Sequence, residues 1–61
     1  MNDDNVLKSI KVMIIDDSNT IRKSAEMFLR SSGYEVILAE DGFEAMSKIV
    51  DNQPDIIFID I

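Results

Sequence analysis

Three short apolar runs divide the chain, and the two segments between them repeat apolar residues at helical spacing. The first run, residues 12–15, and the last, residues 56–59, are apolar at every position. A continuous apolar run without alternation is typical of a strand buried on both faces. The middle run, residues 34–39, carries the polar Glu35 near its start, so we expect a weaker and more peripheral strand there.

Two amphipathic helices are predicted between these strands. Apolar residues recur at i, i+4, i+7 and i+8 in the first segment and at i, i+3, i+6 and i+7 in the second, which gives one apolar face to each helix. The positions are Ile21, Ala25, Phe28 and Leu29 in the first helix and Phe43, Met46, Ile49 and Val50 in the second. Arg22 and Lys23 are expected on the solvated face of the first helix.

Residues that start or stop helices flank both segments. Residues 18–19 are N-cap types, and Gly33 suits the left-handed position that follows a helix. Asp41 and Glu44 have the spacing of a capping box. Pro54 ends the second helix because the residue before proline avoids helical angles. The expected elements are strands at 11–16, 34–39 and 55–60, and helices at 18–32 and 42–52.

The resulting order is β-α-β-α-β, which predicts an α/β fold with a parallel sheet covered on both faces. Right-handed crossovers leave two strand orders. Helices on one face would give the order 1-2-3, and helices on opposite faces would give 2-1-3. The second order is favoured because it places the continuous apolar run of residues 12–15 at the centre, and not the middle run, which has the polar Glu35 near its start.

Composition narrows the class of protein. The 61 residues allow one small domain of marginal stability. A net charge of −6 argues against nucleic acid or a membrane as the main partner. The chain has no cysteine or histidine, which excludes disulfides and the commonest general base. Residues 1–9 are expected to be a flexible acidic leader without signal-peptide features, and the protein is expected to be cytoplasmic. Alternatively, Val6, Leu7 and Ile10 form a short contact with the body.

Acidic residues follow two of the predicted strands. Asp16 and Asp17 come after the first, and Asp60 comes after the third. In a 2-1-3 sheet these strand ends form a topological switch point, where open α/β sheets bind ligands. Two carboxylates about 4 Å apart repel by roughly 4 kcal/mol at an effective dielectric near 20, and Mg²⁺ or Mn²⁺ would offset this. The alternative is that Asp16 and Asp17 are cap and turn residues and Asp60 is a solvated end.

Four pieces of the sequence resemble the receiver domain of bacterial response regulators, the CheY-like, flavodoxin-type fold. They are Asp16-Asp17-Ser18, Gly33-Tyr34-Glu35-Val36, Asp41-Gly42-Phe43-Glu44-Ala45-Met46 and Pro54-Asp55-Ile56-Ile57-Phe58-Ile59-Asp60. The resemblance covers residues 11–61. The sequences of residues 15–22 and 57–61 are most similar to those of single-domain regulators of type IV pilus twitching motility, which work in chemotaxis-like signalling.

The resemblance implies a role for each acid. Asp60 would be the phosphoacceptor and would take a phosphoryl group from a histidine kinase or phosphotransfer protein. Asp17 would bind Mg²⁺ directly, Asp16 mainly through a water molecule, and Asp60 would be a further metal-binding residue. The chain would be a two-component signalling module and not an enzyme, and phosphorylation would change the surface seen by a downstream effector protein.

The family fold continues beyond the third strand. We therefore expect residues 10–61 to be the β-α-β-α-β half of a receiver, with strands 4 and 5 absent. Intrinsic phosphorylation or dephosphorylation activity would be weak or lost. The third strand would be an exposed edge beside apolar surface, and two copies would associate through residues 56–60.

Two other functions remain open at this point. One is a self-assembling structural half-domain whose acids are vestigial. The other is a magnesium-dependent aspartyl phosphatase or phosphotransferase. Such enzymes place an Asp-x-Asp arrangement after the first strand, whereas here Asp16 and Asp17 are adjacent.

Overall fold

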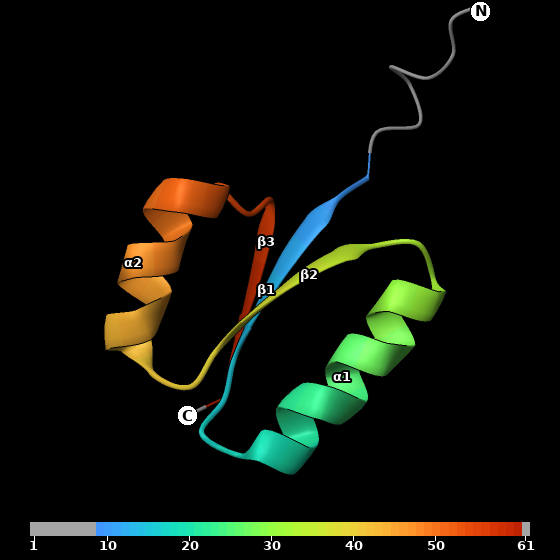
Figure 1. Ribbon diagram of the computed structural model, residues 1–61, viewed down its shortest axis with the longest axis horizontal. Helices are drawn as coiled ribbons and strands as arrows, with labels where there is room; N and C mark the ends of the chain where they lie inside the picture. The colour runs from blue at the N-terminus through green and yellow to red at the C-terminus, as the bar shows by residue number, and fades with distance from the viewer. Residues whose placement is uncertain (1–8, 61) are drawn as a thin grey trace, which may run out of the picture.

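The computed structural model describes residues 9–60, which form three strands and two helices in the predicted order (Figure 1). The strands are β1 (Lys11–Ile15), β2 (Glu35–Ala39) and β3 (Ile56–Ile59), and the helices are α1 (Asn19–Ser31) and α2 (Gly42–Asn52). Each bound lies within one residue of its prediction. The predicted leader lies outside the described residues except for Ser9, as do Val6 and Leu7.

The sheet is parallel and has the order β2-β1-β3, so the predicted 2-1-3 order is confirmed. The two helices cover opposite faces of this sheet (Figure 1). Ile15, the last residue of β1, is paired with Ala39 on one side and Ile59 on the other. All three strands therefore end at the same edge, and the residues that follow them are neighbours.

The central strand supplies the core on both faces of the sheet. Val12 and Ile14 pack toward α1, and Met13 and Ile15 pack toward α2. Successive side chains of a strand point to opposite faces, so one continuous apolar run serves both layers. The α1 layer adds Ala25, Leu29, Tyr34, Val36 and Leu38, and the α2 layer adds Ile37, Ala39, Ala45 and Ile49.

The end of α1 forms a Schellman motif. Gly33 has φ +97°, the left-handed conformation that glycine adopts readily. Its backbone N–H donates to the Arg30 carbonyl at 3.0 Å, and the Tyr34 N–H donates to the Leu29 carbonyl at 3.1 Å. Leu29 and Tyr34 also pack on the same apolar layer, as this motif favours. The predicted role of Gly33 is confirmed.

The start of α2 differs from the predicted capping box in one bond. The Asp41 side chain accepts from the Glu44 N–H at 2.8 Å, as expected. The Glu44 carboxylate then accepts from the Glu40 N–H at 2.7 Å instead of from the Asp41 N–H. Gln53 ends the helix with φ 51°, outside the right-handed helical region, and Pro54 follows it.

The N-cap of α1 offers a measurable contribution to stability. The Ser18 hydroxyl accepts from the Ile21 N–H at 3.2 Å. Ser18→Ala is expected to lower the free energy of unfolding by about 1 kcal/mol, because it leaves that N–H without its partner. Ser24→Ala, at an exposed position within the same helix, is the matched control and should be neutral or slightly stabilising. Urea unfolding monitored by circular dichroism checks both, and equal effects would contradict the cap assignment.

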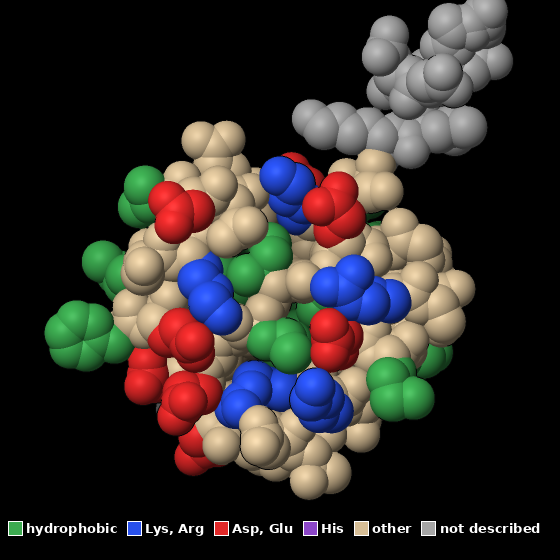
Figure 2. Space-filling view, viewed as in Figure 1, with side chains coloured by type: hydrophobic (Ala, Val, Ile, Leu, Met, Phe, Trp, Pro, Cys, Tyr) green, Lys and Arg blue, Asp and Glu red, His purple; other side chains and the backbone are tan. Residues whose placement is uncertain are grey.

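Much apolar surface stays uncovered. On the predicted helix faces, Ala25, Leu29 and Ile49 pack, while Phe28 and Phe43 are 70% and 91% exposed. All four residues of β3 are exposed. On the face shown in Figure 2, basic and acidic side chains lie beside one another and apolar side chains project at the rim. Neither helix within residues 9–60 is long and apolar enough to cross a membrane.

Candidate functional site

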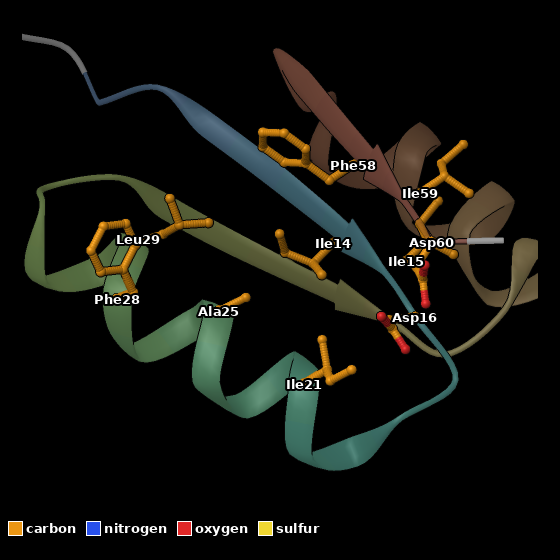
Figure 3. Close-up of a pocket in the computed structure, with 10 residues that line it drawn as sticks. All are labelled: Ile14, Ile15, Asp16, Ile21, Ala25, Phe28, Leu29, Phe58, Ile59 and Asp60. Atoms are coloured by element: carbon orange, nitrogen blue, oxygen red, sulfur yellow. The ribbon is translucent and has the colours of Figure 1, made fainter.

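The acids after β1 and β3 are brought together by the parallel pairing of these strands. The Asp60 N–H donates to the Ile15 carbonyl at 3.0 Å and so continues the β1–β3 ladder by one residue. Asp16 leaves β1 directly beside it, and Figure 3 shows both carboxylates at the same end of the sheet. The predicted proximity of Asp16 and Asp60 is therefore observed.

Asp16 is buried and held at three atoms. Its side chain and backbone are only 4% exposed. The Asp16 N–H donates to the Ala39 carbonyl at 3.1 Å, and one carboxylate oxygen accepts from the Ser18 N–H at 2.8 Å. The Asp16 carbonyl accepts from the Arg22 guanidinium at 2.6 Å. Asp16 is thus both a site acid and the residue that shapes the loop before α1, which combines the two roles that the sequence left open.

Asp17 is exposed to solvent. Within residues 9–60, no hydrogen bond to its carboxylate is present. Its position is therefore set by the backbone on either side of it, which Asp16 and Ser18 fix. Such a carboxylate is free to accept a ligand.

The three acids line one cavity of about 470 Å³ at the carboxyl edge of the sheet. The turn after β2 supplies the opposite wall. The lining residues are Ile15, Asp16, Asp17, Glu40, Asp41, Gly42, Ile59 and Asp60. Asp41 was expected only as part of a capping box, and Glu40 was not predicted to line the site. Applying the strand-end rule to β2, whose last residue is Ala39, would have placed them at the same edge.

A second, more apolar hollow of about 360 Å³ runs between α1 and β3 (Figure 3). Asp16 and Asp60 lie at one end of it. Its remaining lining residues are Ile14, Ile15, Ile21, Ala25, Phe28, Leu29, Phe58 and Ile59. The two acids therefore sit where a polar cavity and an apolar groove meet.

The charge of Asp16 changes the chemistry of Asp60. Repulsion from Asp16 raises the pKa of Asp60 above its ordinary value, and a hydrogen bond to Asp16 that only the protonated form can donate raises it further. Slight desolvation and the charge of Asp17 act in the same direction. By contrast, hydrogen bonds from the Glu40 N–H and from Lys48 lower the pKa of Glu44. Asp60 thus experiences repulsion from the other acids of the cavity, whereas hydrogen bonds stabilise the charged form of the neighbouring Glu44.

The raised pKa predicts how stability depends on pH. Folded Asp60 holds its proton more tightly than unfolded Asp60, so stability falls as the pH rises from the ordinary carboxyl range through the raised pKa. Asp60→Asn is therefore expected to raise the melting temperature at neutral pH and to change it little in strong acid. In an Asp16→Asn background the gain should shrink, because the main source of repulsion is gone. A gain that is the same at every pH would contradict this coupling.

The donors fit a hard divalent cation in their chemistry. Mg²⁺ prefers oxygen ligands and is usually bound by one or two carboxylates. Asp16, Asp17 and Asp60 supply only carboxylate oxygens, and a cation between them would relieve the repulsion that raises the pKa of Asp60. Within the described part of the chain, however, no three acidic side chains converge tightly enough to form a ready-made metal cluster.

Sequence comparison identifies the family. Residues 12–61 match the family described as the response regulator receiver domain. The chain belongs to this family. The expected CheY-like resemblance is confirmed, and so is the half-receiver architecture of three strands and two helices seen in residues 9–60.

Individual relatives agree with this family. The chain is 58% identical to protein PilG of Pseudomonas aeruginosa over 52 residues, which are 85% of this chain and 38% of PilG. It is 36% identical to response regulator MprA of Mycobacterium tuberculosis over 53 residues, which are 87% of this chain and 23% of MprA. The chain therefore spans well under half the length of these relatives. No solved structure matches it.

Proposed function

We propose that this receiver module accepts a phosphoryl group on Asp60 from a histidine kinase or phosphotransfer protein, in a reaction that depends on Mg²⁺. One observation carries the proposal: Asp60 shares its cavity with Asp16 and Asp17 at the switch point of the sheet. Membership of the receiver family supports it, because two-component signalling is the family's role. The resemblance of residues 15–22 to single-domain regulators of type IV pilus twitching motility supports a regulator of that type, and the chain is also similar to protein PilG.

The transfer itself is a nucleophilic substitution at phosphorus. A carboxylate oxygen of Asp60 forms the new P–O bond, the P–N bond to the donor imidazole breaks, and the released nitrogen keeps the electron pair and takes up a proton. Asp16, Asp17 and Asp60 would hold the cation, which would neutralise charge on the phosphoryl group as it moves. Repulsion from Asp16 keeps the Asp60 carboxylate more basic than an ordinary aspartate, which favours attack.

Phosphorylation would change the surface around the site. It adds about −1.5 to −2 of charge beside Asp16 and Asp17. The new group would also lie at the mouth of the apolar groove between α1 and β3. A downstream effector that recognises this end of the sheet would therefore meet a different charge pattern.

Phosphoryl labelling tests the proposal directly. The chain is incubated with Mg²⁺ and acetyl phosphate, and mass spectrometry follows a labile adduct of one phosphoryl group. We expect a small labelled fraction, confined to Asp60 and absent without Mg²⁺. Asp60→Asn should abolish it, and Asp51→Asn, an exposed acid on α2, should leave it unchanged. Absence of any adduct would overturn the proposal, and steady turnover of added phosphoesters would favour the phosphatase instead.

The structure also favours a second proposal, association of two copies through β3. Within residues 9–60 this strand forms one edge of the sheet, and all four of its residues are exposed. An apolar edge of this kind offers its backbone groups to another strand. Sedimentation at decreasing concentration measures the association. A lysine in place of Ile57 should weaken it, and a monomer at all concentrations would overturn this proposal.

A further inference from the structure

Arg22 occupies an unusual place for a cation. It lies in the first turns of α1, near the positive end of the helix dipole, and no acidic side chain is present in that first turn to offset it. A positive charge opposes the dipole there. The expected solvated position is also not observed, because Arg22 is half-buried. Arg22 therefore does not stabilise the helix through its charge, which indicates that its side chain has another role.

The contacts of Arg22 lead to the loop that carries the site acids. One guanidinium nitrogen donates to the Asp16 carbonyl at 2.6 Å, and another donates to the Asn19 side-chain oxygen. The Arg22 backbone N–H donates to the Ser18 carbonyl at 3.0 Å. Arg22 therefore holds both ends of the short loop between β1 and α1.

The Asp16 carbonyl belongs to the peptide group that joins Asp16 to Asp17. Fixing that carbonyl fixes the plane of this peptide, and with it the direction in which Asp17 leaves the strand. The other side of Asp16 is already fixed by the Ala39 carbonyl, and its carboxylate by the Ser18 N–H. Because no side-chain hydrogen bond within residues 9–60 restrains Asp17, its direction depends on the backbone on either side, which the Arg22 contact to the Asp16 carbonyl and the Ser18 N–H bond to the Asp16 carboxylate hold.

We propose that Arg22 is a positioning residue of the site: its two-armed guanidinium fixes the Asp16–Asp17 peptide and so presents the Asp17 carboxylate to a divalent cation. This inference rests on the proposed function, because it concerns the same cation. The guanidinium suits the task because its planar fork reaches two acceptors at once, whereas an ammonium group does not.

Charge and geometry predict opposite results, which makes the proposal testable. Arg22→Met keeps the aliphatic stem but removes the charge and the donors. By electrostatics alone, loss of a nearby positive charge would strengthen Mg²⁺ binding. If Arg22 positions Asp17, the same substitution weakens binding, by about tenfold, the lower end of the range for residues that support metal ligands. Lys23→Met is the matched control, since Lys23 is the adjacent, exposed cation.

The experiment is an Mg²⁺ titration of the complete 61-residue chain, followed through the amide NMR signals of Asp17 and Ser18. Amide exchange at the same two residues without metal measures the order of the loop. We expect faster exchange and about tenfold weaker binding in Arg22→Met, a smaller loss in Arg22→Lys, and equal or slightly tighter binding in Lys23→Met.

The results of this experiment distinguish failure of the Arg22 proposal from failure of the proposed function. Unchanged or tighter Mg²⁺ binding in Arg22→Met overturns the proposal, even where the loop exchanges faster, because Arg22 would then be only structural. Full retention of affinity in Arg22→Lys also overturns it, because charge would then suffice. If the wild-type chain binds no Mg²⁺, the proposed function fails and this inference fails with it. If the wild type binds Mg²⁺ and only the Arg22 prediction fails, the proposed function stands.

Discussion

Replacing Met13 by alanine is expected to unfold most of the protein at room temperature. Met13 is 0% exposed at the centre of β1, where it packs against Ile15, Ala39 and Ala45. Truncating a buried methionine to alanine costs about 2–5 kcal/mol, because transfer energy is lost and a cavity remains. A chain of this length is stabilised by only roughly 3–9 kcal/mol in total, and small domains lie toward the lower end.

Met27→Ala provides the matched control. It removes the same atoms from a methionine on α1 that is 72% exposed, so its effect should stay within about 0.5 kcal/mol. Urea unfolding followed by far-ultraviolet circular dichroism measures both variants. If they lose the same stability, the packing of β1 between two layers is not what holds the fold.

Replacing Asp17 by asparagine is expected to weaken Mg²⁺ binding about thirtyfold. A divalent cation and one carboxylate about 4 Å apart attract by roughly 2 kcal/mol even at the dielectric of water, and each 1.4 kcal/mol is a factor of ten. Asparagine keeps the shape of the side chain and one oxygen but removes the charge. Because the Asp17 side chain is exposed and makes no hydrogen bond within residues 9–60, the fold should tolerate the change.

Asp51→Asn removes the same charge from an exposed position on α2, away from the cavity. Salt screening should reduce its effect on Mg²⁺ binding to less than twofold. Isothermal titration calorimetry measures both affinities, and the melting temperature in the absence of Mg²⁺ checks that each variant folds. Equal losses in the two variants would mean that Mg²⁺ responds to net charge and not to this site.

The sheet could be predicted because its determinants lie in single stretches of sequence. The unbroken apolar run of residues 12–15 favours burial between two layers, and the polar Glu35 near the start of β2 made β1 the better candidate for the central strand. The ends of the helices were also local: Ser18 caps α1 and Gly33 supplies the left-handed turn after it. The meeting of Asp16 with Asp60 then followed from topology and not from any pattern at either residue.

Long side chains were harder to place. Arg22 and Lys48 both donate to backbone carbonyls, of Asp16 and Leu38. Neither contact can be predicted from the hydrophobic pattern, because the acceptor is a main-chain carbonyl oxygen, which every residue has. The sequence also did not show that the Glu44 carboxylate accepts from the Glu40 N–H instead of from the Asp41 N–H, because the donor in both cases is a main-chain group.

The convergence of the acids was predictable only in part. Strand ends place Asp16, Asp17 and Asp60 around one cavity, but the distances between their oxygens depend on side-chain rotation and on the loop geometry. The same applies to the helix faces. Spacing identified the apolar side of α2, but contact with the sheet falls mainly on Ala45 and Ile49, and Phe43 remains 91% exposed.

The pairing of β1 with β3 also determines the stage of folding at which Asp60 comes next to Asp16. The β1–α1 loop closes through local bonds around Ser18, whereas Asp60 arrives only when β3 docks after both crossovers. Such non-local pairing is slow to form, and a thinly covered edge strand is among the first to open. Detachment of β3 would therefore separate Asp60 from Asp16 while α1 and its loop stay folded. We therefore expect the part of the site that carries Asp60 to assemble last and to detach first.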